Sequence, residues 1–180
     1  MRGVFLRGAV GAALVLGVAG AASAQTSVLL PDTSQTTTLT AAVSDQAMVT
    51  VPSGVTFTVN DVTISTTGSA APVTITNIVL ATALRKLKIS IQADAASFTP
   101  PIALATTWSA SDVSWTGGTW TAATPAVNTL SNSAYAEVAR CDADAAACST
   151  SDVAFTLAAK GTVQRSGNHT LVVRWKFESI

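Results

Sequence analysis

Close to its C-terminal end, over residues 171–178, the chain reads LVVRWKFE. Apolar and charged side chains alternate along this stretch, and the apolar set is Leu171, Val173, Trp175 and Phe177. Because successive side chains of a β-strand point to opposite faces, a two-residue period predicts a strand with one buried and one solvated face. The turn sequence at 166–168 favours a hairpin between this strand and the alternating stretch around Phe155.

The same period recurs upstream of this strand. In residues 87–92 the pattern places Leu87, Ile89 and Ile91 inward and Lys88, Ser90 and Gln92 outward. Further strands are expected at 55–59, 62–64, 73–77, 135–138 and 153–157, with a bulge or tight turn near residues 60–61. About seven to nine short strands without a helical period predict an all-β fold. We interpret it as an antiparallel β-sandwich, with immunoglobulin-like and jelly-roll-like topologies both open.

The N-terminus has the three parts of a secretory signal. Arg2 and Arg7 make the N-terminal end cationic, an apolar run covers residues 9–19, and small residues occupy 22–24. The apolar run is shorter than the roughly 20 residues that span a bilayer. The expected organisation is therefore a signal peptide at 1–24, a flexible or extended leader at 25–42, and one sandwich domain at 43–180. Such a chain is exported to the periplasm, the cell surface or the extracellular medium, without a transmembrane segment after cleavage.

Charge is scarce in the expected mature chain. Removing Arg2 and Arg7 from the ten basic residues leaves eight against ten acidic residues, a formal charge of −2. This balance gives no electrostatic reason to expect a nucleic-acid partner. Most polar positions hold Thr, Ser or Asn, which suits close contact with other surfaces.

The two cysteines, Cys141 and Cys148, are expected to form a disulfide because export places them in an oxidising compartment. The short loop predicts a contribution of about 2 to 3 kcal/mol and a bond that pins one local turn. Asp142 and Asp144 inside the loop could supply two oxygen ligands to calcium, which needs six to eight. A solvated acidic tip is the preferred interpretation, and no metal or cofactor is expected.

Candidate catalytic residues are few. His169 is the only histidine, and no nucleophile motif accompanies it. We interpret it as an exposed loop residue. An unusual secreted hydrolase, with His169 or several carboxylates gathered in a cleft, stays as a third hypothesis.

Three tryptophans, Trp108, Trp115 and Trp120, lie close together in a section rich in Pro and Gly. Exposed rings there could form a platform for glycans, whereas inward rings would be core residues. This platform supports a second hypothesis, a secreted carbohydrate-binding module. Trp175 is expected in the core because it shares the apolar face of the last strand.

The leader at 25–42 is rich in Thr and suited to adding a strand to the sheet edge of another copy or of another surface protein. A mobile leader joined to a sandwich that ends in an alternating aromatic strand is similar in architecture to bacterial pilins that assemble by donor-strand exchange. The cysteines differ, because chaperone–usher subunits carry an early, strand-linking pair. Our preferred hypothesis is a noncatalytic structural or adhesive surface protein, with a self-assembling fibre subunit as its specific form.

Overall fold

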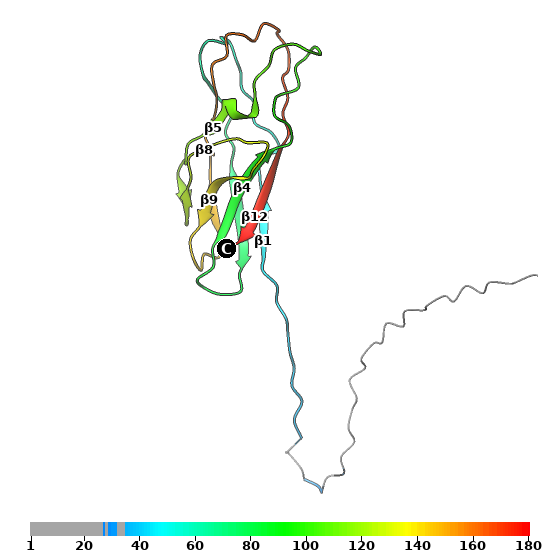
Figure 1. Cartoon of the computed structure of the whole chain (residues 1–180). Helices are drawn as coiled ribbons and strands as arrows, with labels where there is room; N and C mark the ends of the chain where they lie inside the picture. The colour runs from blue at the N-terminus through cyan, green and yellow to red at the C-terminus, as the bar shows by residue number, and fades with distance from the viewer. Residues whose placement is uncertain (1–26, 28, 32–34) are drawn as a thin grey trace, which may run out of the picture. The chain divides into compact units, whose positions relative to one another are not determined.

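A computed structural model of the protein describes residues 27, 29–31 and 35–180 (Figure 1). The predicted signal peptide lies outside the described residues, as do positions 25, 26, 28 and 32–34 of the predicted leader. Internal contacts divide the chain into two units, Met1–Ala41 and Ala42–Ile180. All strands of the described residues belong to the second unit.

The fold is all-β, as predicted, and the twelve strands of the described residues form three antiparallel sheets. The β3 sheet has the order β1 (Gln46–Thr50), β3 (Val73–Val79), β10 (Cys148–Thr150) and β6 (Trp120–Thr121). The β11 sheet has the order β2 (Thr66–Thr67), β11 (Phe155–Leu157), β5 (Val113–Trp115) and β8 (Asn128–Thr129). The β4 sheet has the order β12 (Val173–Ser179), β4 (Leu87–Ala93), β9 (Ala136–Cys141) and β7 (Ala123–Pro125). A short 3₁₀ turn, η1 (Ala110–Asp112), precedes β5.

The β3 and β11 sheets continue one another and form a single layer of the sandwich. In sequence, β2 is followed by β3, and β10 is followed by β11. The two connecting segments also pair, because the N–H of Val153 donates to the carbonyl of Ala71 (3.0 Å). The ladder is interrupted at Pro72, which has no N–H to donate. Interrupted ladders of this kind explain why twelve short strands replace the seven to nine that we predicted.

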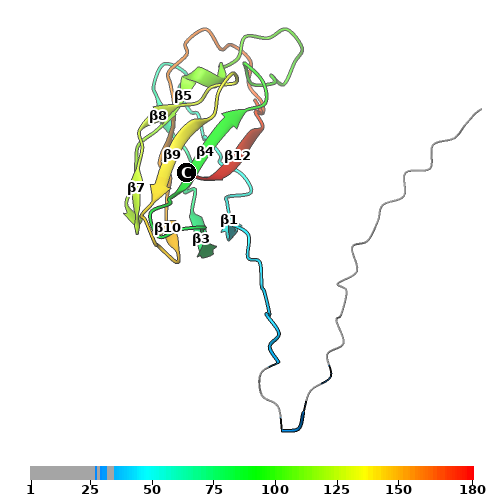
Figure 2. The same cartoon turned by 60° about the horizontal axis from the view of Figure 1, so that its bottom comes forward.

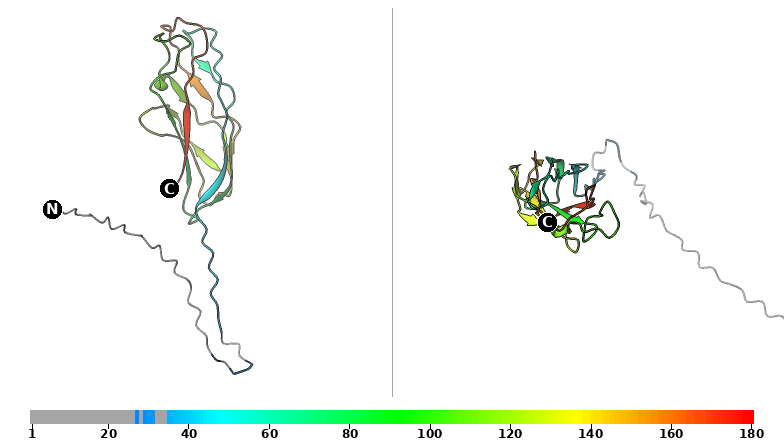
Figure 3. Two further views of the ribbon diagram at one scale, coloured as in Figure 1. Left: turned by 90° about the vertical axis from the view of Figure 1, so that its right-hand side faces the viewer. Right: turned by 90° about the horizontal axis from the view of Figure 1, so that it is seen from above.

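The β4 sheet forms the facing layer, and Figure 3 shows the two layers opposite each other. Its β4 strand has Leu87, Ile89 and Ile91 buried, which confirms their predicted inward direction. Ser90, predicted to face outward into solvent, is instead fully buried. It lies in register between Lys176 and Glu137, whose long side chains flank it on the neighbouring strands.

The predicted hairpin between β11 and β12 is wrong. All seven residues of β12 pair with β4, from Val173 opposite Ala93 to Ser179 opposite Leu87. Figure 2 shows β12 beside β4. Strand β11 instead pairs with β2 and β5 in the other layer. The local turn at 166–168 therefore connects strands of two different layers, and partners distant in sequence complete each sheet.

The prediction for 55–59 is correct in its faces, but the segment does not form a paired strand. Val55, Phe57 and Val59 are half-buried against the core, and Thr56 and Thr58 are exposed. Phe57 makes only an isolated bridge to Gly68, because the N–H of Thr56 is bound by the side chain of Ser69 (3.0 Å) and not by a strand carbonyl. The segment therefore borders the sandwich without joining a ladder.

Candidate interaction surfaces

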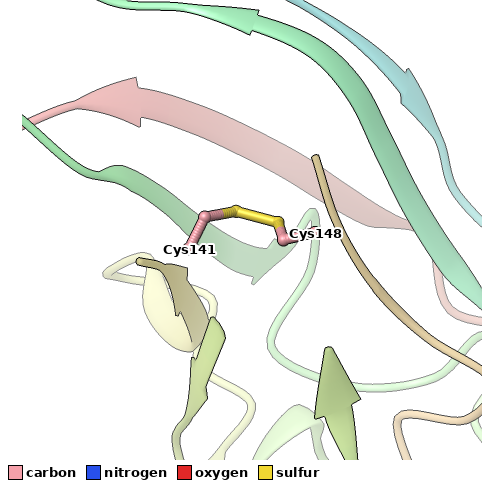
Figure 4. Close-up of a disulfide and its surroundings, with 2 residues drawn as sticks. All are labelled: Cys141 and Cys148. Carbon is pink, nitrogen blue, oxygen red and sulfur yellow. A yellow bond between two sulfur atoms is a disulfide. The ribbon is translucent and has the colours of Figure 1, made fainter. Parts of the chain in front are cut away.

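The predicted disulfide is present, and it joins the two layers (Figure 4). Cys141 ends β9 in the β4 sheet, and Cys148 begins β10 in the β3 sheet. Their Cα atoms are 5.8 Å apart, and both residues are almost fully buried. We predicted a bond that fixes a local turn, but the disulfide instead crosses the core and links one layer of the sandwich to the other. A closed disulfide fits an exported protein.

Membrane-spanning helices are not found among the described residues, since no helix there has the necessary length and apolar character.

The loop inside the disulfide exposes both of its aspartates. Asp142 and Asp144 face solvent, and Asp144 has a left-handed backbone (φ 58°). Within the described ranges, no three side chains of the His, Cys, Asp or Glu types come together where they could hold a metal ion.

His169 is half-buried, contrary to the exposed position that we predicted. Its Nδ1 lies 2.7 Å from the hydroxyl of Thr107, and its Nε2 lies 3.1 Å from the carbonyl oxygen of Arg165. The ring meets Trp108 edge to face, with centroids 5.2 Å apart. These contacts hold the loop before β12 against the sandwich, and no carboxylate is among them.

The tryptophans do not form a common surface platform. Trp108 and Trp115 are 5% and 1% exposed, and the Nε1 of Trp108 donates to the carbonyl of Ala158 (2.9 Å). Trp120 is half-buried at the start of β6 and packs against the core. Two of the three rings offered for the glycan platform are therefore core residues, where burial of their large aromatic areas stabilises the sandwich.

One cluster of polar side chains fastens η1. The Nζ of Lys160 lies 2.7 Å from Asp112 Oδ2 and 3.4 Å from the hydroxyl of Ser109. The same carboxylate accepts the backbone N–H of Ser109 (2.7 Å). The nearby hollow of about 310 Å³, bordered by Ala96, Ala110 and Leu130, has no titratable side chain in its lining. We interpret the cluster as a cap that fixes a loop.

Residues 35–42 of the leader are exposed, and the exposure continues to residue 45. Leu39 is 91% exposed and Val43 is 71% exposed, which is unusual for aliphatic side chains that no neighbour covers. The segment runs directly into β1, which is an edge strand of the β3 sheet. An extended, apolar-bearing segment therefore precedes a sheet edge.

Charge is segregated between the two layers. The eight strands of the β3 and β11 sheets contain no Lys, Arg, Asp or Glu. Thr holds half of their exposed positions, and Met48, Val49 and Val79 are exposed among the others. Register places Thr50, Thr74, Ser149 and Thr121 side by side across the β3 sheet. All six charged residues found within strands lie in the β4 sheet. One face of the sandwich is therefore neutral and hydroxyl-rich, and the other is charged.

No protein-family model, curated protein or solved structure matches this chain. The geometry of the leader, the sheet edges and the neutral face is thus the basis for a functional proposal.

Proposed function

We propose that this chain is a noncatalytic structural protein of the cell surface, whose copies associate when the leader of one adds a strand to a sheet of the next. The observation that carries the proposal is the exposed segment 35–45, with Leu39 and Val43 in solvent, immediately before the edge strand β1. Strand addition uses main-chain hydrogen bonds for affinity and alternate side chains for specificity. A segment of this kind needs no pocket on its partner.

The neutral face supports the same proposal. Desolvating Thr and Ser hydroxyls costs much less free energy than desolvating ammonium or carboxylate groups. Copies can therefore pack closely on this face without burying unpaired charges. The predicted signal and a disulfide typical of oxidising compartments support a setting outside the cytoplasm, of which the cell surface is one.

The decisive experiment compares the mature chain, residues 25–180, with a chain that lacks residues 25–42. Sedimentation velocity over a range of concentrations is expected to show oligomers for the first and a monomer for the second. At a concentration too low for assembly, urea unfolding is expected to give both chains the same midpoint, because the buried core lies entirely within residues 71–163.

A matched control replaces residues 25–42 by a Gly/Ser sequence of the same length. It is expected to be monomeric, because a Gly/Ser chain lacks the side chains that fill a sheet face. Equal behaviour of all three chains, whether monomeric or oligomeric, would overturn the proposal.

A further inference from the structure

The edge of β12 has a full row of free backbone groups. At one end of β12, Lys86 and Ile180 each donate a backbone N–H to the other's carbonyl, with N to O distances of 3.1 and 3.0 Å. At the other end, the N–H of Asp94 donates to the carbonyl of Val172. In an antiparallel pair such bonded positions recur at every second residue. Even-numbered residues of β12 therefore bond to β4, and the backbone groups of Val173, Trp175 and Phe177 point to the unpaired side.

The same odd-numbered residues carry the apolar face of β12. Trp175 and Phe177 stack with their rings nearly parallel (11°) and centroids 6.5 Å apart, and they pack against the core. Both stay only half-buried, whereas Ile89 and Ile91, their partners on β4, are fully buried. The sandwich is thus incompletely covered where it ends at β12.

The leader carries the complementary pattern. Within residues 38–44, Leu39, Ala41 and Val43 share one parity, and mainly hydroxyl residues occupy the other. This is the two-residue period of a half-buried strand, yet every side chain in the segment is exposed. The segment has seven residues, as β12 does, and it contains no charge. We call residues 38–44 the donor segment.

Building on the proposed function, we propose that the acceptor is β12, and that the donor segment of a second copy pairs with it as an additional edge strand. Leu39, Ala41 and Val43 then cover the exposed sides of Trp175 and Phe177. The hydroxyl side chains of the donor lie on the outer face, beside Arg174 and Lys176. Backbone pairing satisfies the free groups of the β12 edge, which in a lone copy bind only water.

Arg85 contacts both the end of β12 and the residue before β1. Its Nη1 lies 3.0 Å from the hydroxyl of Ser179, at the end of β12, and 3.8 Å from Asp45 Oδ2. The donor segment of each copy therefore leaves its own sandwich close to the end of β12. A contact between two different surfaces of the chain is heterologous, and repetition of it generates a ring or an open fibre.

The test measures amide hydrogen exchange on the mature chain, residues 25–180, below and above its assembly concentration. Assembly is expected to slow exchange at Val173, Trp175 and Phe177 and within residues 38–44. Oligomers that require the leader but protect β1, β7 or β8, and leave β12 unchanged, would overturn the acceptor and leave the proposed function standing. A monomer whose β12 is protected by its own leader would overturn both.

Two variants sharpen the result. Val173→Pro removes an N–H that makes no bond to β4, so no hydrogen bond of the monomer is lost and only the altered side-chain packing can shift its urea midpoint. Assembly is expected to weaken about tenfold. Leu39→Ser with Val43→Ser is expected to abolish assembly. Its matched control, Thr40→Ser with Ser44→Thr, changes the opposite parity and is expected to assemble normally. If all of these variants assembled as strongly as the parent chain, the pairing of the donor segment with β12 would be contradicted, whatever the exchange data on the parent chain.

Discussion

The carboxylate of Asp152 substitutes for a strand partner at the point where the ladder of the neutral layer is interrupted. Its Oδ1 accepts the backbone N–H of Ala71 (2.9 Å), and Ala71 is fully buried. Asp152→Ala leaves that N–H without a partner, and we expect a loss of about 1 to 3 kcal/mol in the free energy of unfolding. Asp152→Asn keeps an acceptor oxygen and should recover most of the loss in urea titrations. Equal losses for both variants would contradict this role.

A second residue-scale prediction concerns the turn at Asp61. The hydroxyl and the backbone N–H of Thr63 both donate to Asp61 Oδ1, at 2.7 and 2.8 Å, and they lower the pKa of that carboxyl from its ordinary value of 3.8. Since the folded pKa lies below the unfolded pKa, the stabilisation is complete above the unfolded value and is lost as the pH falls through the folded one.

Replacing Thr63 by Val removes the hydroxyl donor and keeps the shape. Carboxylate NMR titration should then show the pKa of Asp61 moving up toward its ordinary value, and the acid-induced loss of stability at this turn should become smaller. A titration curve identical to that of the parent chain would refute the assignment of the shift to Thr63.

At the scale of elements, the disulfide connects β9 of one layer to β10 of the other. We expect Cys141→Ala with Cys148→Ala to lower the free energy of unfolding by about 2 to 3 kcal/mol, because the unfolded chain gains freedom. The corresponding double Ser variant should be less stable than the double Ala variant, since both positions are buried and the hydroxyls need partners. Urea unfolding of these variants and of the reduced parent chain measures both effects. A double Ser variant as stable as the double Ala variant would contradict the predicted cost of burying the hydroxyls.

The strands also show which part of an element can be predicted locally. The faces of 55–59, 87–91 and 153–157 are largely correct because alternation depends on neighbouring residues alone. The pairing of β12 with β4 was not predicted, because the paired residues lie 80 to 92 positions apart and no turn sequence specifies them. The alternation of Leu39, Ala41 and Val43 is also present in the sequence, but the Thr-rich composition around it favoured the interpretation of a flexible leader.

At the scale of the whole molecule, assembly through uncharged segments predicts a weak response to salt. The donor segment has no charge, and the apolar face of β12 presents Trp175 and Phe177 to it. Between about 0.05 and 0.5 M NaCl, screening strongly weakens contacts made by charged groups. We expect the association constant to change by less than about twofold over this range, as measured by sedimentation. A steep fall with salt would indicate that the charged face of the β4 sheet mediates the contact instead.

By itself, the sequence determined the all-β class, the inward face of the best alternating strands and the pairing of its only two cysteines. These features depend on side-chain period and residue type, which are local properties of the chain. Only the tertiary structure decided the partner of each strand, the burial of Trp108 and Trp115, and the position of the disulfide between layers. Such features arise when residues far apart in sequence share one core, because the free energy of packing depends on all of its neighbours together.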